Sequence, residues 1–492
     1  MSAPTGSNAS ADSQETVHEV IVVGAGFAGI GTAIRLRQAG VDCVVLEKSH
    51  ELGGVWRDNS YPDCGCDVPS ALYSYSFAPN PHWSRLFAKQ QEIKNYTRDT
   101  AQKFGVTHSI RLGHELTEAR WDRSKKQWRL QTSAGVFWTR FVVMACGPMH
   151  VPVVPRLPGL DTFTGVHFHS SRWDHRFDMH GKRVAVIGSG ASAIQFVPKI
   201  QPLVQSLTLF QRTAPWVLPK LDAPIALRWQ ERFARRPWTQ RLFRTLLYLQ
   251  FELLNASLNF PWMLRRIQAQ GVKNINKGVA DPALRAQLTP DYSVGCKRIL
   301  LSNNWYPALS KPNVTVRPDV VRIEGSQVIA SDDSRCEVDA IVFATGFEVA
   351  NPPIANSIIG ESGLPLSALW KGSPSAYLGT MTQDCPNLFL TFGPNLYTFN
   401  SAFVIIEAQL QFIVSAITTA RKRGLSQIAV NPERMAKYNA QVQTALQRTV
   451  WNSGCTSYFL DNNGRNSTNW PWTTFTMRQQ LAKFRPQDFV TE

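Results

Sequence analysis

The fold of this chain is decided by the stretch Val20-Ile21-Val22-Val23-Gly24-Ala25-Gly26-Phe27-Ala28-Gly29. Its first four residues are β-branched and uncharged, which predicts a buried parallel strand. Helical apolar spacing follows over residues 30–38, and a second apolar run over residues 41–46 predicts the next strand, which ends at Glu47. Strand, glycine turn, helix and strand form a βαβ unit of the dinucleotide-binding kind.

The glycines and the acid of this unit have separate tasks. Gly24 makes the turn, Gly26 lets the backbone approach a pyrophosphate, and Gly29 allows the helix to pack closely. The pyrophosphate would lie at the helix N-terminus, and Glu47 would bind a ribose hydroxyl. An acid at this position suits an unphosphorylated ribose, so we expect FAD at the first site.

A second unit of the same design begins with Arg183-Val184-Ala185-Val186-Ile187 and continues as Gly188-Ser189-Gly190-Ala191-Ser192-Ala193. Its next strand, over residues 207–210, is followed not by an acid but by Gln211-Arg212-Thr213. A cation in place of the acid is expected where the ribose carries a 2′-phosphate. Arg212 could be a plain surface charge, but its place after a dinucleotide fold favours NADPH over NADH at the second site.

Between the two units lies Phe163-Thr164-Gly165-Val166-His167-Phe168-His169-Ser170-Ser171-Arg172-Trp173-Asp174, here called the central linker. We expect two cofactors to meet across this aromatic-rich stretch, and we expect the stretch to couple the movements of their domains.

Length and charge limit the domain count and the partners. A chain of 492 residues is too long for one hydrophobic core. Its net charge of +16 comes without runs of like charge or an RNA-binding motif. That pattern favours anionic cofactors over nucleic acid.

We therefore predict an α/β fold with two Rossmann-like dinucleotide-binding domains, for FAD and NADPH, and a helical insertion. The predicted parts are a disordered tail over residues 1–17, an FAD-binding domain over 18–150 and 341–492, an NADPH-binding domain over 151–219 and 291–340, and the insertion over 220–290.

The cysteines and the longest apolar stretch bear on the compartment. Eight scattered cysteines are no disulfide framework for a chain of this size. Cys64 and Cys66 lack the spacing of a flavin disulfide reductase and the further ligands of a zinc site, so we expect reduced thiols, no metal and a cytoplasmic location. Residues 242–264 are too polar to span a bilayer, and no transmembrane segment is predicted. Two alternatives remain for this stretch, which lies beside Arg265 and Arg266: it lies on a membrane surface, or it forms a packed helix of a soluble domain, as we expect.

Two features follow the first unit. Gly53-Gly54 permits another close approach of backbone to a ligand, and Trp56 beside it favours a cofactor contact over plain core. Asp67 is either a helix N-cap or a carboxylate near the cofactor, and the local sequence does not separate these alternatives.

Two longer patterns now resemble a known family. The central linker matches F-x-G-x-x-x-H-x-x-x-W-[PD] at Phe163, Gly165, His169, Trp173 and Asp174. The pattern G-G-x-W followed by Y-P-G-x-x-x-D is met by Gly53, Gly54, Trp56, Tyr61, Pro62 and Asp67. Asp63 stands where that pattern usually has glycine, so the resemblance leaves the shape of this turn open. From about residue 20 to residue 472 the chain is similar to the type I Baeyer–Villiger monooxygenases, which belong to the class B flavoprotein monooxygenases. These enzymes convert ketones to esters or lactones with FAD, NADPH and O2, by way of a flavin C4a-peroxide.

The resemblance implies a role for each candidate residue. FAD would be held by Gly24, Gly26, Gly29, Glu47, Gly54, Trp56 and Tyr73. The NADP 2′-phosphate would be held by Arg212, Thr213 and Lys297. Further cofactor contacts would come from Phe27, Val55, Asp67, Leu116, Gly188, Ser189, Gly190 and Ser192. His169 and Trp173 would couple domain movement to NADPH binding. The catalytic arginine falls on Arg298 and its carboxylate partner on Asp67.

The implied chemistry gives a reason for that last pair. A fixed guanidinium stabilises the negative charge of a peroxide and of its carbonyl adduct, and it does not act as a proton donor. The carboxylate would orient the guanidinium. The expected partners are therefore a small-molecule ketone substrate and O2. Pocket candidates are residues 396–399, Trp305 and Trp451, each of which could equally belong to the core.

Three other functions remain as alternatives. An N- or S-oxygenating flavin monooxygenase shares most of the pattern but needs no Arg298. A disulfide reductase needs a spaced cysteine pair, which the sequence lacks. A nucleotide-binding sensor would not turn over NADPH.

Overall fold

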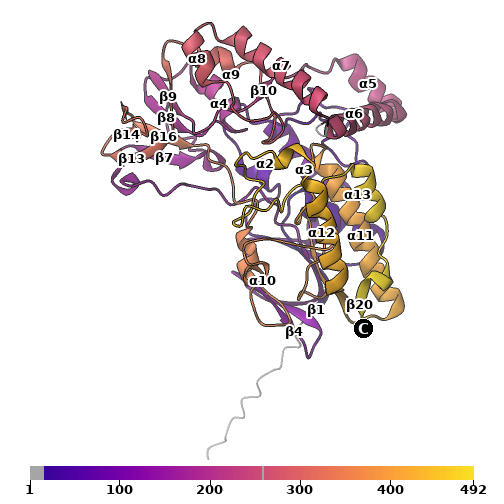
Figure 1. Cartoon of the computed structure of the whole chain (residues 1–492). Helices are drawn as coiled ribbons and strands as arrows, with labels where there is room; N and C mark the ends of the chain where they lie inside the picture. The colour runs from indigo at the N-terminus through magenta and orange to yellow at the C-terminus, as the bar shows by residue number, and fades with distance from the viewer. Residues whose placement is uncertain (1–15, 258–259) are drawn as a thin grey trace, which may run out of the picture.

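The computed structural model describes residues 16–257 and 260–492. The predicted tail over residues 1–17 lies outside the described residues except for its last two, of which Val17 already begins the first strand. Two sheets dominated by parallel strands are arranged one above the other, and helices pack around both (Figure 1). The predicted α/β class with two Rossmann-type units is confirmed.

The first sheet has eight strands in the order β17-β4-β5-β6-β1-β2-β3, with β18 also paired to β6. Its strands are β1 (Val17–Val23), β2 (Cys43–Glu47), β3 (Ile110–Leu112), β4 (Leu116–Asp122), β5 (Gln127–Thr132), β6 (Gly135–Met144), β17 (Ile358–Ile359) and β18 (Leu388–Leu390). β1 runs parallel to both β2 and β6. β5 and β6 form an antiparallel hairpin that turns between residues 132 and 135.

The second sheet is parallel throughout, in the order β12-β9-β8-β16-β7. Its strands are β7 (Val166–His169), β8 (Arg183–Ile187), β9 (Ser206–Phe210), β12 (Val314–Arg317) and β16 (Ala340–Phe343). The predicted domain boundary between residues 340 and 341 runs through β16, which pairs along its whole length with β7 and β8. The strand therefore belongs entirely to the second sheet.

Small sheets complete the strands: β10 (Val217–Leu218) with β11 (Leu300–Leu301), β13 (Val320–Glu324) with β14 (Gln327–Ala330) and β15 (Arg335–Glu337), and β19 (Ile428–Val430) with β20 (Phe489–Thr491). The helices are α1 (Phe27–Gln38), α2 (Val55–Asp58), α3 (Gln90–Lys103), α4 (Ala193–Ile200), α5 (Leu227–Arg235), α6 (Pro237–Ser257), α7 (Pro261–Gly278), α8 (Pro282–Gln287), α9 (Trp305–Leu309), α10 (Leu366–Trp370), α11 (Ala402–Arg423), α12 (Pro432–Leu446) and α13 (Thr474–Gln480).

The alternation of side chains explains why the central strands are apolar along their whole length. In β1, Val20 and Val22 enter one core, whereas Ile21 and Val23 enter the core on the other face of the sheet. In β8 the same alternation places Val184 and Val186 in one core and Ala185 and Ile187 in the core on the opposite face of the sheet. Strands covered on both faces need no polar side, as expected of parallel sheets between helices.

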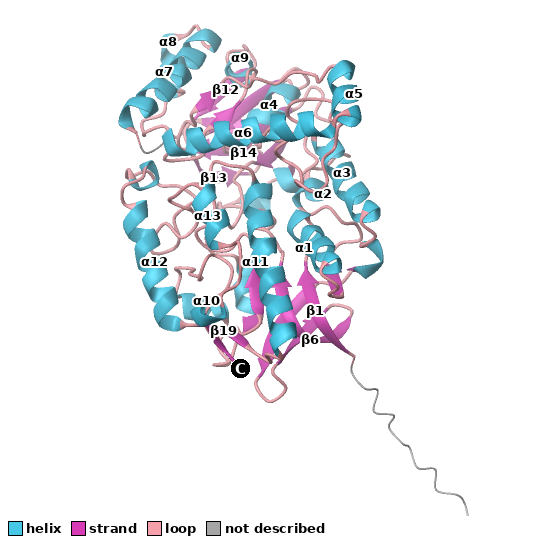
Figure 2. Ribbon diagram, turned by 90° about the vertical axis from the view of Figure 1, so that its right-hand side faces the viewer, coloured by secondary structure: helices cyan, strands magenta, loops and turns pink. Residues whose placement is uncertain are grey.

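The helical insertion is formed by α5 to α8, in agreement with the sequence (Figures 1 and 2). The apolar stretch over residues 242–264, expected as one packed helix, is instead shared between α6 and α7. Among the described residues, α11 is the one helix long and apolar enough to cross a membrane, and most of that apolar stretch is buried in the protein.

Candidate active site

One cavity of about 1150 Å³ is lined by both glycine-rich motifs and by the segments between them. Of the predicted site residues, its wall contains Gly24, Gly26, Phe27, Glu47, Gly54, Val55, Trp56, Asp67, Tyr73, Leu116, Gly188, Ser189, Gly190, Ser192, Arg212, Thr213, Lys297 and Arg298. Gly29, His169 and Trp173 lie outside the wall. The cavity therefore brings together residues that are distant in sequence, such as Gly26 and Arg298, which are 272 positions apart.

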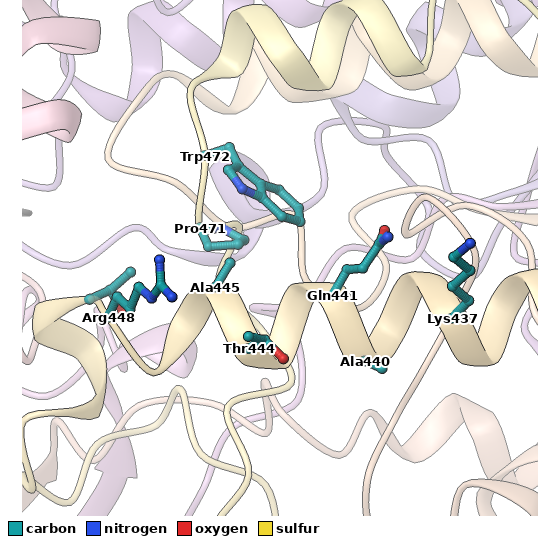
Figure 3. A pocket seen from close by; sticks show the side chains of 9 residues that line it. Lys437, Ala440, Gln441, Thr444, Ala445, Arg448, Pro471 and Trp472 are labelled. Atoms are coloured by element: carbon teal, nitrogen blue, oxygen red, sulfur yellow. The ribbon is translucent and has the colours of Figure 1, made fainter.

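A second hollow of about 730 Å³ lies beside α12, between residues such as Gln441 and Trp472 (Figure 3). None of the predicted site residues lines it. The larger cavity is therefore the candidate active site.

The first glycine motif forms a backbone cradle for a dinucleotide. A Cβ atom built on Gly54 would lie 3.2 Å from the Cα of Gly26, so these two glycines bring their backbones close together at the cavity wall. A Cβ atom on Gly29 would lie 1.8 Å from the carbonyl oxygen of Gly24, which is why the helix can pack here only on glycine. At the end of β2, the buried Glu47 accepts hydrogen bonds from the Ala25 N–H at 2.8 Å and from Arg57 at 2.9 Å. These residues fit FAD, whose adenosine ribose Glu47 would bind.

The second motif repeats the first in its backbone. Gly24 and Gly188 have φ angles of +107° and +103°, and a Cβ atom on either would lie 2.6 Å from a carbonyl oxygen of the neighbouring strand end. These oxygens belong to Ala145 and Ala344. Both turns thus require glycine for the same two reasons, left-handed conformation and close contact.

Two cations face the cavity near the second motif. Burial lowers the pKa of Lys297, and the nearby charge of Arg212 lowers it further. The ammonium of Lys297 lies 4.6 Å from the centre of the Tyr292 ring. Two cations that repel one another across a cavity wall fit a dianionic group such as the 2′-phosphate of NADP.

Arg298 and Asp67 form the charged centre of the cavity. Arg298 Nη2 donates to the Asp67 carboxylate at 2.6 and 2.8 Å, and Nε donates at 3.1 Å. Burial opposes ionisation of Asp67, but the charge of Arg298 outweighs it and holds the carboxyl pKa below its ordinary value. The same attraction raises the pKa of Arg298 well above its ordinary value. Asp67 is therefore an ion-pair partner and not the N-cap of a helix.

Two tyrosines complete this centre, and the sequence did not connect them with Arg298. Arg298 Nη1 donates to the hydroxyl oxygen of Tyr397 at 3.2 Å. Tyr458 also lines the cavity, and its proximity adds to the raised pKa of Arg298. Tyr397 lies in the predicted pocket stretch over residues 396–399, whereas nothing in the local sequence singles out Tyr458.

The turn at Asp63 has the conformation that glycine would favour. Its φ angle is +66°, in the left-handed region, and its carboxylate pairs with Lys89 at 2.8 Å. The departure from the family pattern therefore leaves a left-handed turn in front of Asp67, and the Lys89 ion pair helps to hold it.

The central linker is part of the second sheet, because its residues Val166–His169 form the edge strand β7. His169 ends β7, is buried, and packs against Phe347 with ring centres 5.6 Å apart. Burial lowers its pKa to about 4, so the ring is neutral at pH 7. Trp173 packs against Phe196 of α4 at 5.1 Å. Neither residue lines the cavity: His169 contacts, through Phe347, the segment that follows β16, and Trp173 packs within the second unit.

One disulfide forms among the scattered cysteines, although the sequence indicated no disulfide framework. Cys296 is bonded to Cys455, 159 positions further along the chain. The bond ties the segment before Arg298 to the loop that carries Tyr458. Cys64 and Cys66 are free and buried, as expected, and burial raises the pKa of Cys64 to about 12. No group of three or more metal-ligating side chains occurs among residues 16–257 and 260–492.

Comparisons with known proteins agree with this geometry. Residues 17–372 match the family of flavin-binding monooxygenase-like proteins. A Baeyer–Villiger monooxygenase of Streptomyces coelicolor is 46% identical over 95% of this chain and 92% of its own. One from Pseudomonas aeruginosa is 42% identical over 95% and 90%. Among solved structures, an oxidized steroid monooxygenase bound to NADP has a TM-score of 0.86 at 29% identity, covering 97% of this chain and 99% of its own. Cyclohexanone monooxygenase from a Rhodococcus species, bound to NADP+, has a TM-score of 0.86 at 25% identity, covering 95% and 97%.

Proposed function

The chain belongs to the flavin-binding monooxygenase-like family, and from that premise we propose that it oxygenates ketones at a centre formed by Arg298 and Asp67. The protein is a Baeyer–Villiger monooxygenase that uses FAD and NADPH. The observation that carries the proposal is that the Arg298–Asp67 ion pair lies in the wall of the same cavity as both nucleotide motifs. The chemistry that FAD supplies when bound is acceptance of a hydride from NADPH and activation of O2.

Arg298 provides a permanent positive charge at this centre. Because its pKa is raised well above the ordinary value, it keeps its protons and stabilises negative charge that develops on oxygen atoms nearby. Asp67 fixes the plane of the guanidinium with three short hydrogen bonds. Nη1 reaches out to the Tyr397 hydroxyl oxygen, so this tyrosine helps to fix the face that Arg298 presents to the cavity.

The other end of the cavity recognises the nicotinamide cofactor. We propose that Arg212, Thr213 and Lys297 hold the 2′-phosphate, and that His169 and Trp173 transmit the position of the second sheet to the first. We keep the predicted division into domains, with the last boundary moved beyond β16. We also retain the cytoplasmic location as a proposal, and the Cys296–Cys455 bond makes it testable because disulfides are rare in that compartment.

Side-by-side turnover tests the proposed substrate. The purified enzyme with FAD and NADPH is supplied in turn with ketones, alkyl sulfides and tertiary amines, and products are identified by mass. We expect esters or lactones from ketones, with one NADPH oxidised per ester formed. Efficient sulfoxide or N-oxide formation without any ester would instead support the N- or S-oxygenating alternative.

A further inference from the structure

Helix α6 exposes apolar side chains in a single stripe. Its solvent-facing residues at spacings of three and four are Trp238, Leu242, Leu246, Leu249 and Leu253, between 42 and 70% exposed. Residues at this spacing lie along one side of a helix. In a helix that only packs on a soluble domain, this side would be polar.

Five polar side chains of α6 point into the protein, although Arg241, Thr245 and Gln250 of the same helix are exposed. The five inward side chains are Gln240, Arg244, Tyr248, Glu252 and Asn255. Glu252, for example, accepts hydrogen bonds from the Thr474 N–H at 2.9 Å and from Asn400 at 2.6 Å. Most of these inward polar groups are hydrogen-bonded within the protein, while the tryptophan and the leucines of the stripe face outward. Part of the usual amphipathic arrangement is therefore reversed.

The neighbouring helices extend this surface and give it charge. α5 and α7 lie near the two ends of α6 (Figure 2), with Trp229 and Trp262 about half exposed. The exposed basic residues flanking the stripe include Arg235, Arg236, Arg241, Arg265 and Arg266. Within residues 227–257 and 260–278, Glu231 is the only exposed carboxylate.

We propose that the surface formed by α5, α6 and α7 docks the enzyme on an anionic lipid bilayer. Leucines would enter the acyl region, tryptophans would lie at the interface, and arginines would pair with anionic headgroups. A second copy of the chain fits less well, because it would set one cationic surface against another. Phe251 and Leu254 of α6 line the cavity, so the docked helix would separate the bilayer from the cavity by one helix diameter, about 10 Å. That position would suit a ketone that partitions into lipid.

Vesicle flotation of the holoenzyme tests the docking. The probes are vesicles of phosphatidylcholine alone and vesicles with a third phosphatidylglycerol. We expect binding to the anionic vesicles, weakened at least tenfold by 0.5 M NaCl, by Leu246→Gln with Leu253→Gln, or by Arg235→Gln with Arg236→Gln. Leu364→Gln is the matched control, because Leu364 is 51% exposed but lies before α10, away from this surface. It should bind as the unmodified enzyme does.

Bound-flavin absorbance and the unfolding temperature show whether each variant is folded. Absence of flotation with anionic vesicles at low salt would overturn the proposal. Equal binding by folded double variants, or equal binding to neutral vesicles, would do the same. A dimer in sedimentation velocity that the leucine variant dissociates, without vesicle binding, would assign the surface to a second copy.

Discussion

The Arg298→Ala variant separates flavin reduction from oxygen transfer. It removes three hydrogen bonds to Asp67 and one to Tyr397, and with them the positive charge at the centre of the cavity. The nucleotide motifs keep their contacts, so FAD content and the rate of flavin reduction by NADPH should change little. Ester formation should fall by about two to three powers of ten, the usual cost of losing one charge-stabilising donor. The consumed NADPH should appear as hydrogen peroxide.

The same change has a cost in stability. Breaking a fully buried ion pair costs about 3–5 kcal/mol, and an exposed pair contributes less than about 1 kcal/mol. The side chains of Arg298 and Asp67 are 29% and 26% exposed, so we expect a loss of about 2 kcal/mol. The Asp67 carboxyl, left without its partner, should then titrate at higher pH than in the unmodified enzyme.

Four measurements decide this prediction: anaerobic stopped-flow reduction, ester yield, a peroxide assay, and unfolding in urea. The double variant Arg298→Ala with Asp67→Asn is the matched control, because it removes the unpaired carboxylate. It should regain part of the stability and none of the ester formation. Ester formation by folded Arg298→Ala within threefold of the unmodified rate would refute the assignment of Arg298.

Four further variants test other parts of the structure. Lys297→Ala should raise the NADPH KM about tenfold, which corresponds to the loss of one charge-assisted hydrogen bond, and the variant should still form ester at saturating NADPH. Arg212→Ala should narrow the preference for NADPH over NADH. Unchanged steady-state constants in both variants would mean that these cations do not bind the 2′-phosphate. The pKa of His169 is about 4 in the folded protein and near 6.5 in the unfolded chain, so the free energy of unfolding should fall by about 2 kcal/mol from pH 7 to pH 5. Urea titrations should show a smaller fall for His169→Gln. Equal falls in the two proteins would contradict the argument that burial lowers this pKa. Cys296→Ser should lower the free energy of unfolding by about 5 kcal/mol, because the bond to Cys455 closes a loop spanning 159 positions. The same unfolding midpoint with and without reductant in the unmodified protein would argue against the bond.

The sequence by itself determined the two βαβ units and their ligands. Strand, glycine turn, helix and acid lie within about 30 residues, and local spacing fixes the geometry of such a unit. The absence of an acid and the presence of Arg212 after the second unit pointed to NADPH by the same local reasoning. Arg298 and Asp67, in contrast, were found by resemblance, because nothing local joins residues 231 positions apart.

Only the tertiary structure decided the contacts between distant segments. It placed Tyr397 and Tyr458 beside Arg298, and it brought Cys296 to Cys455, because chain folding and not local periodicity sets these neighbours. It also decided which side of α6 faces solvent. The apolar stretch alone is compatible with packing or with a surface, and the orientation depends on whether buried partners exist for Glu252 and its polar neighbours. Those partners come from residues about 150–220 positions further along the chain, which no local pattern specifies.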